Sequence, residues 1–145
     1  MRDIIIAKRE HLPHIATLES KTFDEPWSEQ ALELFLKENA FCVVCYENDE
    51  LASYCTVMTV LDEAQIINVA TDNKYKRQGC GADVIKSVLE ECTERALKMV
   101  SLEVRESNVP AITLYKNFGF SIEGKRKDFY KNPRENALVM IKNLD

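Results

Sequence analysis

The chain has 145 residues, of which 46% are hydrophobic and 30% are charged, and its formal net charge is −5. These values are typical of a folded globular chain, so we expect residues 1–145 to form a single domain, and a disordered chain is excluded. The negative charge argues against general nucleic-acid affinity, which depends on lysine and arginine neutralising phosphates, and it favours a basic protein or peptide as partner.

The start of the chain has neither a targeting nor a membrane-spanning pattern. Residues 3–7 carry three isoleucines and are followed by charged residues, so this apolar run is too short for a signal-peptide core. No apolar run approaches the length of a membrane span. The five cysteines lack a regular framework, as expected in a reducing compartment. We therefore expect a cytoplasmic protein without a membrane partner, in which residues 3–7 form a short first strand.

Two helices are predicted next, at residues 12–21 and 29–37. Apolar residues recur at helical spacing in both. Ser28 is a good N-cap for the second helix, because its hydroxyl can accept a hydrogen bond from a backbone amide of the first turn. Trp27 precedes the cap, where its ring can pack on Leu32 as a hydrophobic staple.

Three strands are predicted after the helices, at residues 41–46, 51–60 and 65–71. The polar run 47–50 has the composition of a hairpin turn. The three strands therefore form an antiparallel row that ends at a glycine-containing turn.

The cysteine and histidine patterns do not predict a metal site. Cys42 and Cys45 form a C-x-x-C, but they lie in a predicted strand, where this odd spacing points them to opposite faces. The only histidines are His11 and His14, and no clear partner ligands follow them. We interpret both as polar residues at a helix start.

Residues 65–97 are predicted to form a strand, a turn and a helix. The first third is apolar and β-prone, and the last third has apolar residues at the spacing of one helix face. Between them, Gly79 and Gly81 let the backbone turn tightly where the helix starts, so several amide hydrogens point outward together. Such a helix N-terminus binds anions, and Lys76 and Arg77 add positive charge beside it.

The motifs that this turn lacks limit which anion it can bind. Neither glycine is followed by the Gly-Lys-Ser/Thr of a P-loop, which argues against nucleoside triphosphate hydrolysis. A dinucleotide fingerprint would need a third glycine at the position of Val84. From the residues alone, a solvated surface turn and an anion site are both open interpretations.

The last part of the chain is predicted to hold three strands and one helix. Residues 99–105 alternate apolar and polar side chains, as a strand buried on one face does. Asn108 can cap the following helix, and Gly119 can close it. The remaining segments are strands at residues 120–127 and 136–141, with a loop at residues 128–135 between them.

The order of the elements, β-α-α-β-β-β-α-β-α-β-β, predicts an α+β fold. It consists of one mixed, mostly antiparallel sheet with helices on both faces. The strand before the glycine turn and the strand after its helix should be parallel neighbours, because a right-handed crossover joins them.

Short motifs along nearly the whole chain match one enzyme family. They are EPWS (25–28), LDEA (61–64), NVA (68–70), KYKRQGCG (74–81), LEVRESN (102–108), LY (114–115), FGF (118–120) and PRENAL (133–138). In this order they resemble the GCN5-related N-acetyltransferases, and within them the bacterial ribosomal-protein-alanine N-acetyltransferases.

The resemblance implies acetyl-coenzyme A as the cofactor. In this family the glycine turn holds the pyrophosphate, and the two parallel strands splay apart so that the pantetheine arm enters between them. The backbone of residues 68–71 then binds the arm, and the amide of Val69 polarises the thioester carbonyl. The cofactor-binding residues implied in this way are Val69, Ala70, Thr71, Lys76, Arg77, Gln78, Gly79, Cys80, Gly81, Ala82 and Asn108.

The resemblance also implies two catalytic residues. Glu103 would be the general base, directly or through water, and Tyr115 would be the acid that protonates the leaving thiolate. Each position has a simpler structural interpretation. Glu103 could form an ion pair with Arg105 on the same strand face, and Tyr115 could be a core residue beside Phe118.

The acceptor implied by the resemblance is the N-terminal amine of a protein, and specifically of a small-subunit ribosomal protein. An α-amino group has a pKa of about 7.7–8.0 and is partly neutral at cytosolic pH, whereas a lysine at about 10.4 is almost fully charged. A single carboxylate base therefore suits an α-amine better. Trp27 would form one wall of the acceptor groove, and Tyr130 would close over the acceptor or, alternatively, pack on Trp27.

Departures from the family pattern keep other functions open. Phe129 stands where a second tyrosine is common, and Thr71 stands where a valine is usual, which leaves the acceptor open. Lysine side chains, polyamines or an aminoglycoside-like amine are alternative acceptors. A non-catalytic acyl-coenzyme A-binding module is the alternative from another class. The sequence does not indicate an oligomeric state.

Overall fold

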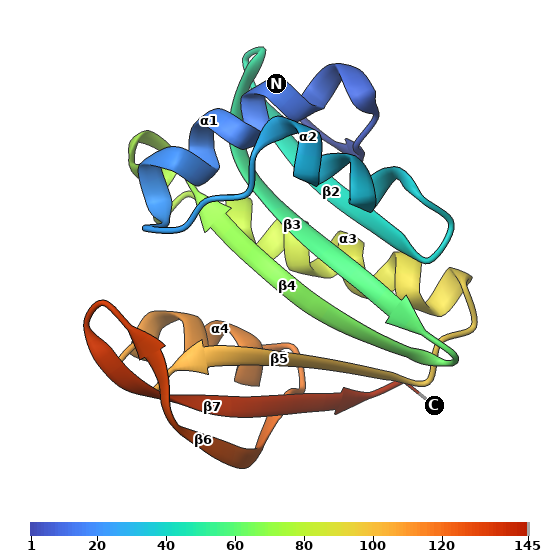
Figure 1. The fold of residues 1–145 in the computed structure, drawn as a ribbon. Helices are drawn as coiled ribbons and strands as arrows, with labels where there is room; N and C mark the ends of the chain where they lie inside the picture. The colour runs from blue at the N-terminus through green and yellow to red at the C-terminus, as the bar shows by residue number, and fades with distance from the viewer. Residues whose placement is uncertain (145) are drawn as a thin grey trace.

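The computed structural model describes residues 1–144 and places all its strands in one seven-stranded sheet (Figure 1). The strand order is β1-β2-β3-β4-β5-β7-β6, and every neighbouring pair is antiparallel except β4 and β5. The predicted mixed, mostly antiparallel sheet is therefore confirmed. The strands are β1 (Arg2–Ile6), β2 (Ala40–Glu47), β3 (Glu50–Val60), β4 (Glu63–Thr71), β5 (Met99–Arg105), β6 (Ser121–Lys131) and β7 (Arg134–Asn143).

Helices cover both faces of the sheet, as predicted. On one face lie α1 (Leu12–Thr22), α2 (Glu29–Leu32) and the 3₁₀ turn η2 (Glu33–Leu36), and on the other lie α3 (Cys80–Glu94) and α4 (Val109–Asn117). Two further 3₁₀ turns are η1 (Arg9–His11) and η3 (Asn73–Tyr75). Among residues 1–144, every helix is too short or too polar to cross a lipid bilayer.

The predicted helix at residues 29–37 is wrong in its second half. Its N-cap is confirmed, because Ser28 Oγ accepts a hydrogen bond from the Ala31 amide at 3.1 Å. After Leu32, however, the chain tightens into η2. In a 3₁₀ turn, side chains three residues apart align, so Leu32 and Phe35 both point to the sheet and both are buried. The tighter turn thus keeps this i, i+3 pair on the buried face.

The predicted loop at residues 128–135 is also wrong. β6 runs on to Lys131 and β7 begins at Arg134, so only two residues connect the strands. The ladder is irregular between Arg126 and Tyr130, where the extra residues of β6 are accommodated. Asp128 adopts a positive φ of 54°, and its amide donates to Asn136 Oδ1 at 2.9 Å. These polar residues therefore form a bulge within the hairpin.

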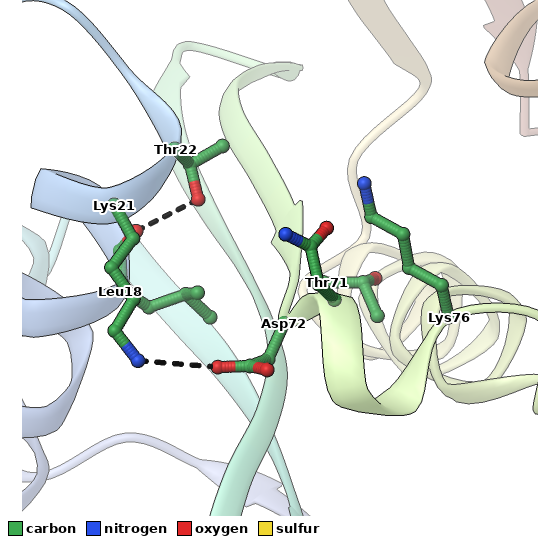
Figure 2. Close-up of a pocket in the computed structure, with 7 residues that line it drawn as sticks. Leu18, Lys21, Thr22, Thr71, Asp72 and Lys76 are labelled. Carbon is green, nitrogen blue, oxygen red and sulfur yellow. Dashed lines mark hydrogen bonds and ion pairs between the residues drawn. The ribbon is translucent and has the colours of Figure 1, made fainter.

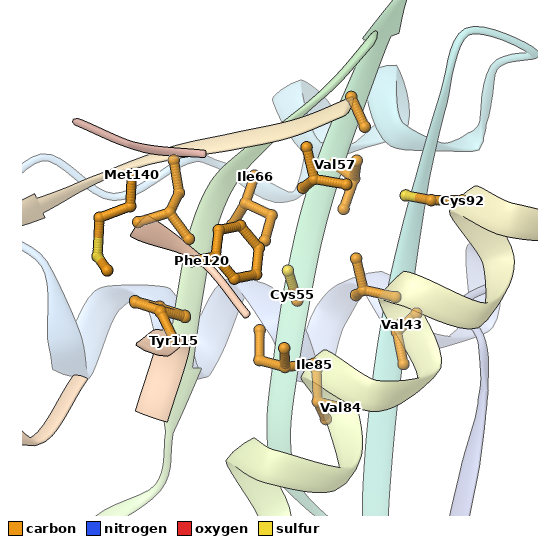
Figure 3. Close-up of a cluster of buried hydrophobic side chains, with 14 of the residues drawn as sticks. Val43, Cys55, Val57, Ile66, Val84, Ile85, Cys92, Tyr115, Phe120 and Met140 are labelled. Carbon is orange, nitrogen blue, oxygen red and sulfur yellow. The ribbon is translucent and has the colours of Figure 1, made fainter. Parts of the chain in front are cut away.

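The core consists of two apolar clusters, one on each face of the sheet. The cluster under α3 and α4 is shown in Figure 3 and includes Ile85, Tyr115 and Phe120. The other lies under α1 and α2. Cys42 belongs to the cluster under α1 and Cys45 to the one under α3, which confirms that the C-x-x-C faces opposite sides. Both are buried free thiols.

The parallel pair β4 and β5 separates soon after it forms. The strands pair only from Glu63 opposite Met99 to Gln65 opposite Ser101. Beyond this point, the β3–β4 register shifts so that Thr56 pairs with Asn68 and Val57 with Ile66, which leaves Ile67 as a bulge. A bulge bends its strand. The predicted splay is thus confirmed, and Figure 1 shows the two strands diverging.

Candidate active site

A cavity of about 830 Å³ occupies the gap between the splayed strands. Its walls come from the C-terminal halves of β4 and β5, from the loop between α1 and α2, and from the β6–β7 turn. Nine of the fifteen candidate residues from the sequence line this cavity. The cavity brings together Trp27, Val69, Ala70, Thr71, Lys76, Glu103, Asn108, Tyr115 and Tyr130, while residues 77–82 lie at the start of α3.

The glycine turn has the backbone that the sequence predicts. Gly79 has a φ of +82° and is the N-cap residue of α3, so a left-handed residue precedes the first helical turn. The first backbone amides of a helix have no partner within it and carry its positive dipole end. A Cβ on Gly81 would lie 3.4 Å from Thr71 Oγ1, so the turn packs closely against the end of β4. The helix starts at Cys80, two residues earlier than the apolar pattern begins.

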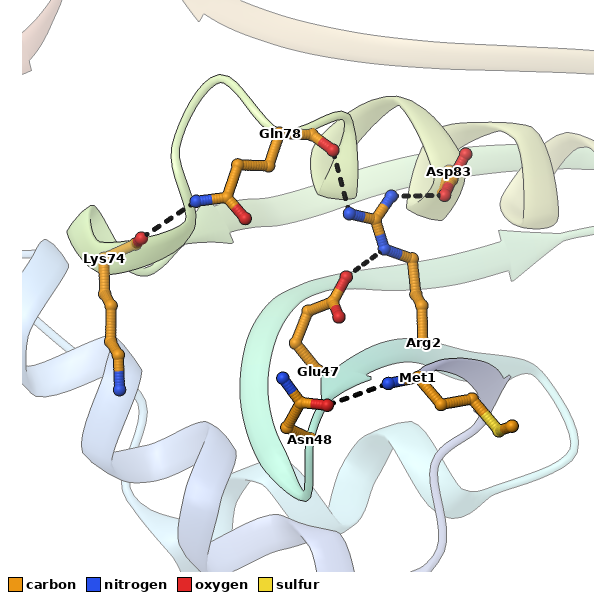
Figure 4. A network of polar contacts seen from close by, with 7 residues as sticks. All are labelled: Met1, Arg2, Glu47, Asn48, Lys74, Gln78 and Asp83. Carbon is orange, nitrogen blue, oxygen red and sulfur yellow. Dashed lines mark hydrogen bonds and ion pairs between the residues drawn. The ribbon is translucent and has the colours of Figure 1, made fainter.

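Arg2 anchors the opposite side of this turn and was not identified from the sequence. Its Nη2 donates to the Gln78 carbonyl at 2.8 Å and its Nη1 to Asp83 Oδ2 at 2.7 Å, while Nε donates to Glu47 (Figure 4). The hydrogen bonds with Asp83 and then Glu47 raise the pKa of Arg2 further above its usual value. Arg2 thereby attaches β1 to the turn through the carbonyl of Gln78.

The cations beside the turn differ in their contacts. Lys74 Nζ lies 2.8 Å from Glu50 Oε1, so its charge is directed away from the turn. Lys76 lines both the main cavity and a smaller one of about 310 Å³ beside it (Figure 2). In the smaller cavity, Lys21 Nζ lies 3.6 Å from Asp72 Oδ2. Of the cations beside the turn, Lys76 is therefore the one that lines the main cavity.

Glu103 projects from β5 into the cavity, and its side chain is 18% exposed. Arg126 Nε lies 2.5 Å from its Oε2, but this oxygen is fully buried and accepts no properly directed hydrogen bond. Glu103 therefore forms an ion pair, as the structural interpretation predicts, but its partner is Arg126 and not Arg105. Arg105 lies 3.2 Å from Glu135 Oε1 instead, and its guanidinium stacks 4.3 Å from the Tyr130 ring.

Tyr115 both lines the cavity and belongs to the core. It is buried in α4, and its ring lies 5.8 Å from that of Phe120 (Figure 3). Burial raises the pKa of Tyr115 above its usual value, so the phenol stays protonated at neutral pH. Near it, Asn108 Oδ1 caps α4 by accepting from the Ala111 amide at 3.3 Å, as predicted.

Trp27 and Tyr130 lie on opposite walls of the cavity. The Trp27 ring lies 5.1 Å from that of Phe35 and packs on the cluster that contains Leu32. The Tyr130 ring lies 5.1 Å from that of Phe129 and also contacts Arg105, and within residues 1–144 it forms no aromatic pair with Trp27. The alternative in which Tyr130 packs on Trp27 is therefore wrong. Both side chains line the same cavity.

A second buried network lies behind Trp27 and was also missed from the sequence. Glu19 on α1 accepts hydrogen bonds from the Trp27 amide, from Asn68 and from Tyr54. One signal could have identified it: Glu19 follows Leu12 and Ile15 at helical spacing, so it falls on the inward face of its helix.

Comparison with known proteins gives one consistent family. The model of the acetyltransferase (GNAT) family matches residues 12–120. A putative [ribosomal protein bS18]-alanine N-acetyltransferase of Bacillus subtilis (strain 168) is 38% identical over 133 residues, which are 90% of this chain and 88% of the relative.

Solved structures agree with this assignment. The ribosomal-protein-S18-alanine N-acetyltransferase from Escherichia coli superimposes with a TM-score of 0.92 at 31% identity, covering 100% of this chain and 95% of that one. A Bacillus subtilis acetyltransferase in complex with CoA has the same fold, with a TM-score of 0.78 at 17% identity and full coverage of both chains.

The donor used by this family is acetyl-coenzyme A, and the site described above fits it. A left-handed glycine and the first amides of α3 suit a diphosphate, and the part of β4 that is not paired with β5 lines a cavity of about 830 Å³. From its sequence, its fold and the geometry of this cavity, the chain belongs to the GNAT family of N-acetyltransferases.

Proposed function

We propose that this protein is an N-α-acetyltransferase that modifies the N-terminal amine of a ribosomal protein. The observation that carries the proposal is the cavity itself, which brings Lys76 of the turn before α3 together with Glu103 and Tyr115 and is also lined by Trp27 and Tyr130. The named activity of the relatives from Bacillus subtilis and Escherichia coli supports bS18 as the acceptor.

The first part of the proposal concerns binding of the donor. Backbone amides at the start of α3 would hold the diphosphate, with Lys76 and Arg77 beside it, and the β4 edge would hold the arm. Acetyl-coenzyme A supplies the acetyl group as a thioester. The residues that we assign to this binding are Val69, Ala70, Thr71, Lys76, Arg77, Gln78, Gly79, Cys80, Gly81, Ala82 and Asn108.

Glu103 is the proposed general base. Its carboxylate faces the cavity from the middle of β5, where it can accept a proton from an amine, directly or through one water. An α-amine has a pKa of about 7.7–8.0, so the base has to remove a proton that is already weakly held. The nearby Arg126 guanidinium directs one carboxylate oxygen, which leaves the other for the acceptor.

Tyr115 is the proposed general acid. Its raised pKa keeps the hydroxyl protonated, so a proton is available in the buried part of the cavity. A thiolate released in the same poorly solvated space is also more basic than in water, because burial disfavours both anions. Proton transfer from the phenol to the sulfur is therefore close to balanced.

Trp27 and Tyr130 are the proposed walls of the acceptor groove. They border the cavity from opposite sides, and Phe129, which is 43% exposed, lies beside Tyr130 at the turn. An extended peptide entering between them would bring its first residue to Glu103.

Mass spectrometry of peptides incubated with the protein and acetyl-coenzyme A tests the proposal. A peptide with the N-terminal sequence of bS18 should gain one acetyl group on its α-amine. The matched control has the α-amine blocked and an internal lysine free, and it should stay unmodified. Reaction of the blocked peptide would favour a lysine or small-amine acetyltransferase, and no reaction of any peptide would reject the proposal.

A further inference from the structure

Glu19 is a carboxylate in an unusual position, because its side chain lies in the last turns of α1 and is 0% exposed. Burying an ionised carboxylate is costly unless it is paired with a cation or receives several hydrogen bonds. Within residues 1–144, no lysine, arginine or histidine nitrogen lies within 4 Å of it. Hydrogen bonds must therefore compensate for its burial.

Three donors from three different segments converge on Glu19. Its Oε1 accepts from the Trp27 amide at 2.9 Å, and its Oε2 accepts from Asn68 Nδ2 at 2.9 Å and from the Tyr54 hydroxyl. An ionised carboxylate is an acceptor only, which matches a site made entirely of donors.

Two of these donors belong to the walls of the proposed active site. Trp27 lies in the loop that borders the cavity on the acceptor side, and Asn68 lies next to the β4 bulge on the donor side. The other hydrogen bonds of this loop stay within its flanking helices, such as Phe23 N to Glu19 O and Ala31 N to Ser28 Oγ. In the described part of the chain, the Glu19 carboxylate is thus the polar link between the loop and the sheet.

We propose that Glu19 is a positioning residue that fixes the Trp27 loop against β4 and thereby sets the width of the acceptor groove. It does not line the cavity, so it acts through Trp27 and Asn68 and not on the reacting atoms. The role in acceptor binding rests on the function proposed above. The role of Glu19 in fixing the position of the loop does not depend on that function.

The variant Glu19→Gln tests the link while keeping the shape of the side chain. A glutamine offers one acceptor oxygen, and its NH₂ group would face the donors of Asn68 and Tyr54. The loop should therefore loosen while β4, which the β3 ladder holds, stays in place. We expect the KM for the acceptor peptide to rise about tenfold, equivalent to about 1.4 kcal/mol, with kcat and the Kd for acetyl-coenzyme A within about twofold.

Tyr54→Phe is the matched control, because it removes the third hydrogen bond but leaves both links between the walls. A purely structural role for the network predicts similar KM changes in the two variants, and that result would overturn the proposal. A wild-type KM in Glu19→Gln would overturn it as well. Where Glu19→Gln fails to fold, Asn68→Ala cuts the same link from the other side and should raise the peptide KM more than Tyr54→Phe does.

The fluorescence of Trp27 gives a readout that does not depend on catalysis, because it is the only tryptophan in the chain. Glu19→Gln should shift its emission to longer wavelength and about double its quenching by acrylamide, and Tyr54→Phe should change neither. If the wild-type protein acetylates no peptide but Trp27 responds in this way, the proposed function fails and the positioning role stands. If the protein acetylates peptides and Trp27 does not respond, the positioning role fails.

Discussion

The two walls of the cavity are built in different ways. The donor wall consists of the glycine turn and β4, where a positive φ at Gly79 and a bulge at Ile67 shape a continuous piece of backbone. The acceptor wall consists of the loop before α2 and the β6–β7 turn, which are held in place by side chains from other elements. Glu19 holds the loop, and Arg105 holds the turn through the Pro133 carbonyl at 2.9 Å.

This difference indicates how the two binding functions can change. A backbone cradle recognises a diphosphate whatever the neighbouring side chains are, so it tolerates substitution outside its glycines. Walls held by single side-chain contacts can move when one contact changes, so they can be adapted to different acceptors. The predictions below test whether the two walls behave independently.

The largest expected effect is a loss of kcat in a variant of Glu103 that leaves donor binding unchanged. Glu103→Gln should lower kcat by about 10²–10⁴-fold, because general acid–base catalysis contributes on that scale, and leave the Kd for acetyl-coenzyme A unchanged. Steady-state kinetics and calorimetry measure the two quantities. The control is Glu106→Gln, which removes an exposed partner of Lys125 just beyond β5. Equal losses of kcat in both variants would contradict the role of Glu103.

The next effect should weaken the donor wall alone. Gly79→Ala places a side chain at a φ of +82°, which costs about 1–2 kcal/mol and favours a shift of the turn. The Kd for acetyl-coenzyme A, measured by calorimetry, should rise about tenfold. The control is Gly124→Ala on β6, where the new Cβ would make an ordinary contact, 3.9 Å from Val139 Cβ. A larger change in Gly124→Ala would contradict a donor site at the turn.

A smaller effect on donor binding should follow from replacing Arg2, which holds the glycine turn from β1. Arg2→Gln removes the charged hydrogen bonds to Gln78 and Asp83, and the turn should become less well ordered. We expect the Kd for acetyl-coenzyme A to rise about threefold and the peptide KM to stay the same. Arg9→Gln, which removes an exposed ion pair with Glu33, is the control. A rise in peptide KM alone would show that the two walls are not independent.

The smallest expected effect is a flat pH dependence on the alkaline side. Burial raises the pKa of Tyr115, so the protonated, active phenol is lost only as pH rises through a value above its usual 10. The rate should therefore rise to about pH 8 as the acceptor α-amine loses its proton, and then change by less than about twofold up to about pH 10. A pH profile of kcat measures this, and a decline that begins near pH 8 would contradict Tyr115 as the acid.

The same comparison explains what the sequence could predict. The glycine turn follows from neighbouring residues, and the parallel strand pair follows from the right-handed crossover that joins consecutive strands, so local patterns predict both. The contacts of Arg2 with Gln78 and of Glu19 with Asn68 join residues 76 and 49 positions apart, which no local pattern reports. The acceptor wall was therefore predicted least well, and the Asp128–Glu135 segment was mistaken for a loop because its polar residues form a bulge instead.

A crystal structure with a bisubstrate analogue, coenzyme A joined to the N-terminus of a bS18 peptide, tests the central claim most directly. We predict the diphosphate on the amides that begin α3, the sulfur beside the Tyr115 hydroxyl, and the peptide nitrogen within about 3 Å of Glu103 or one water away from it. The peptide should leave the cavity between Trp27 and Tyr130. A diphosphate bound away from Gly79 and Gly81, or a peptide nitrogen far from Glu103, would contradict the account.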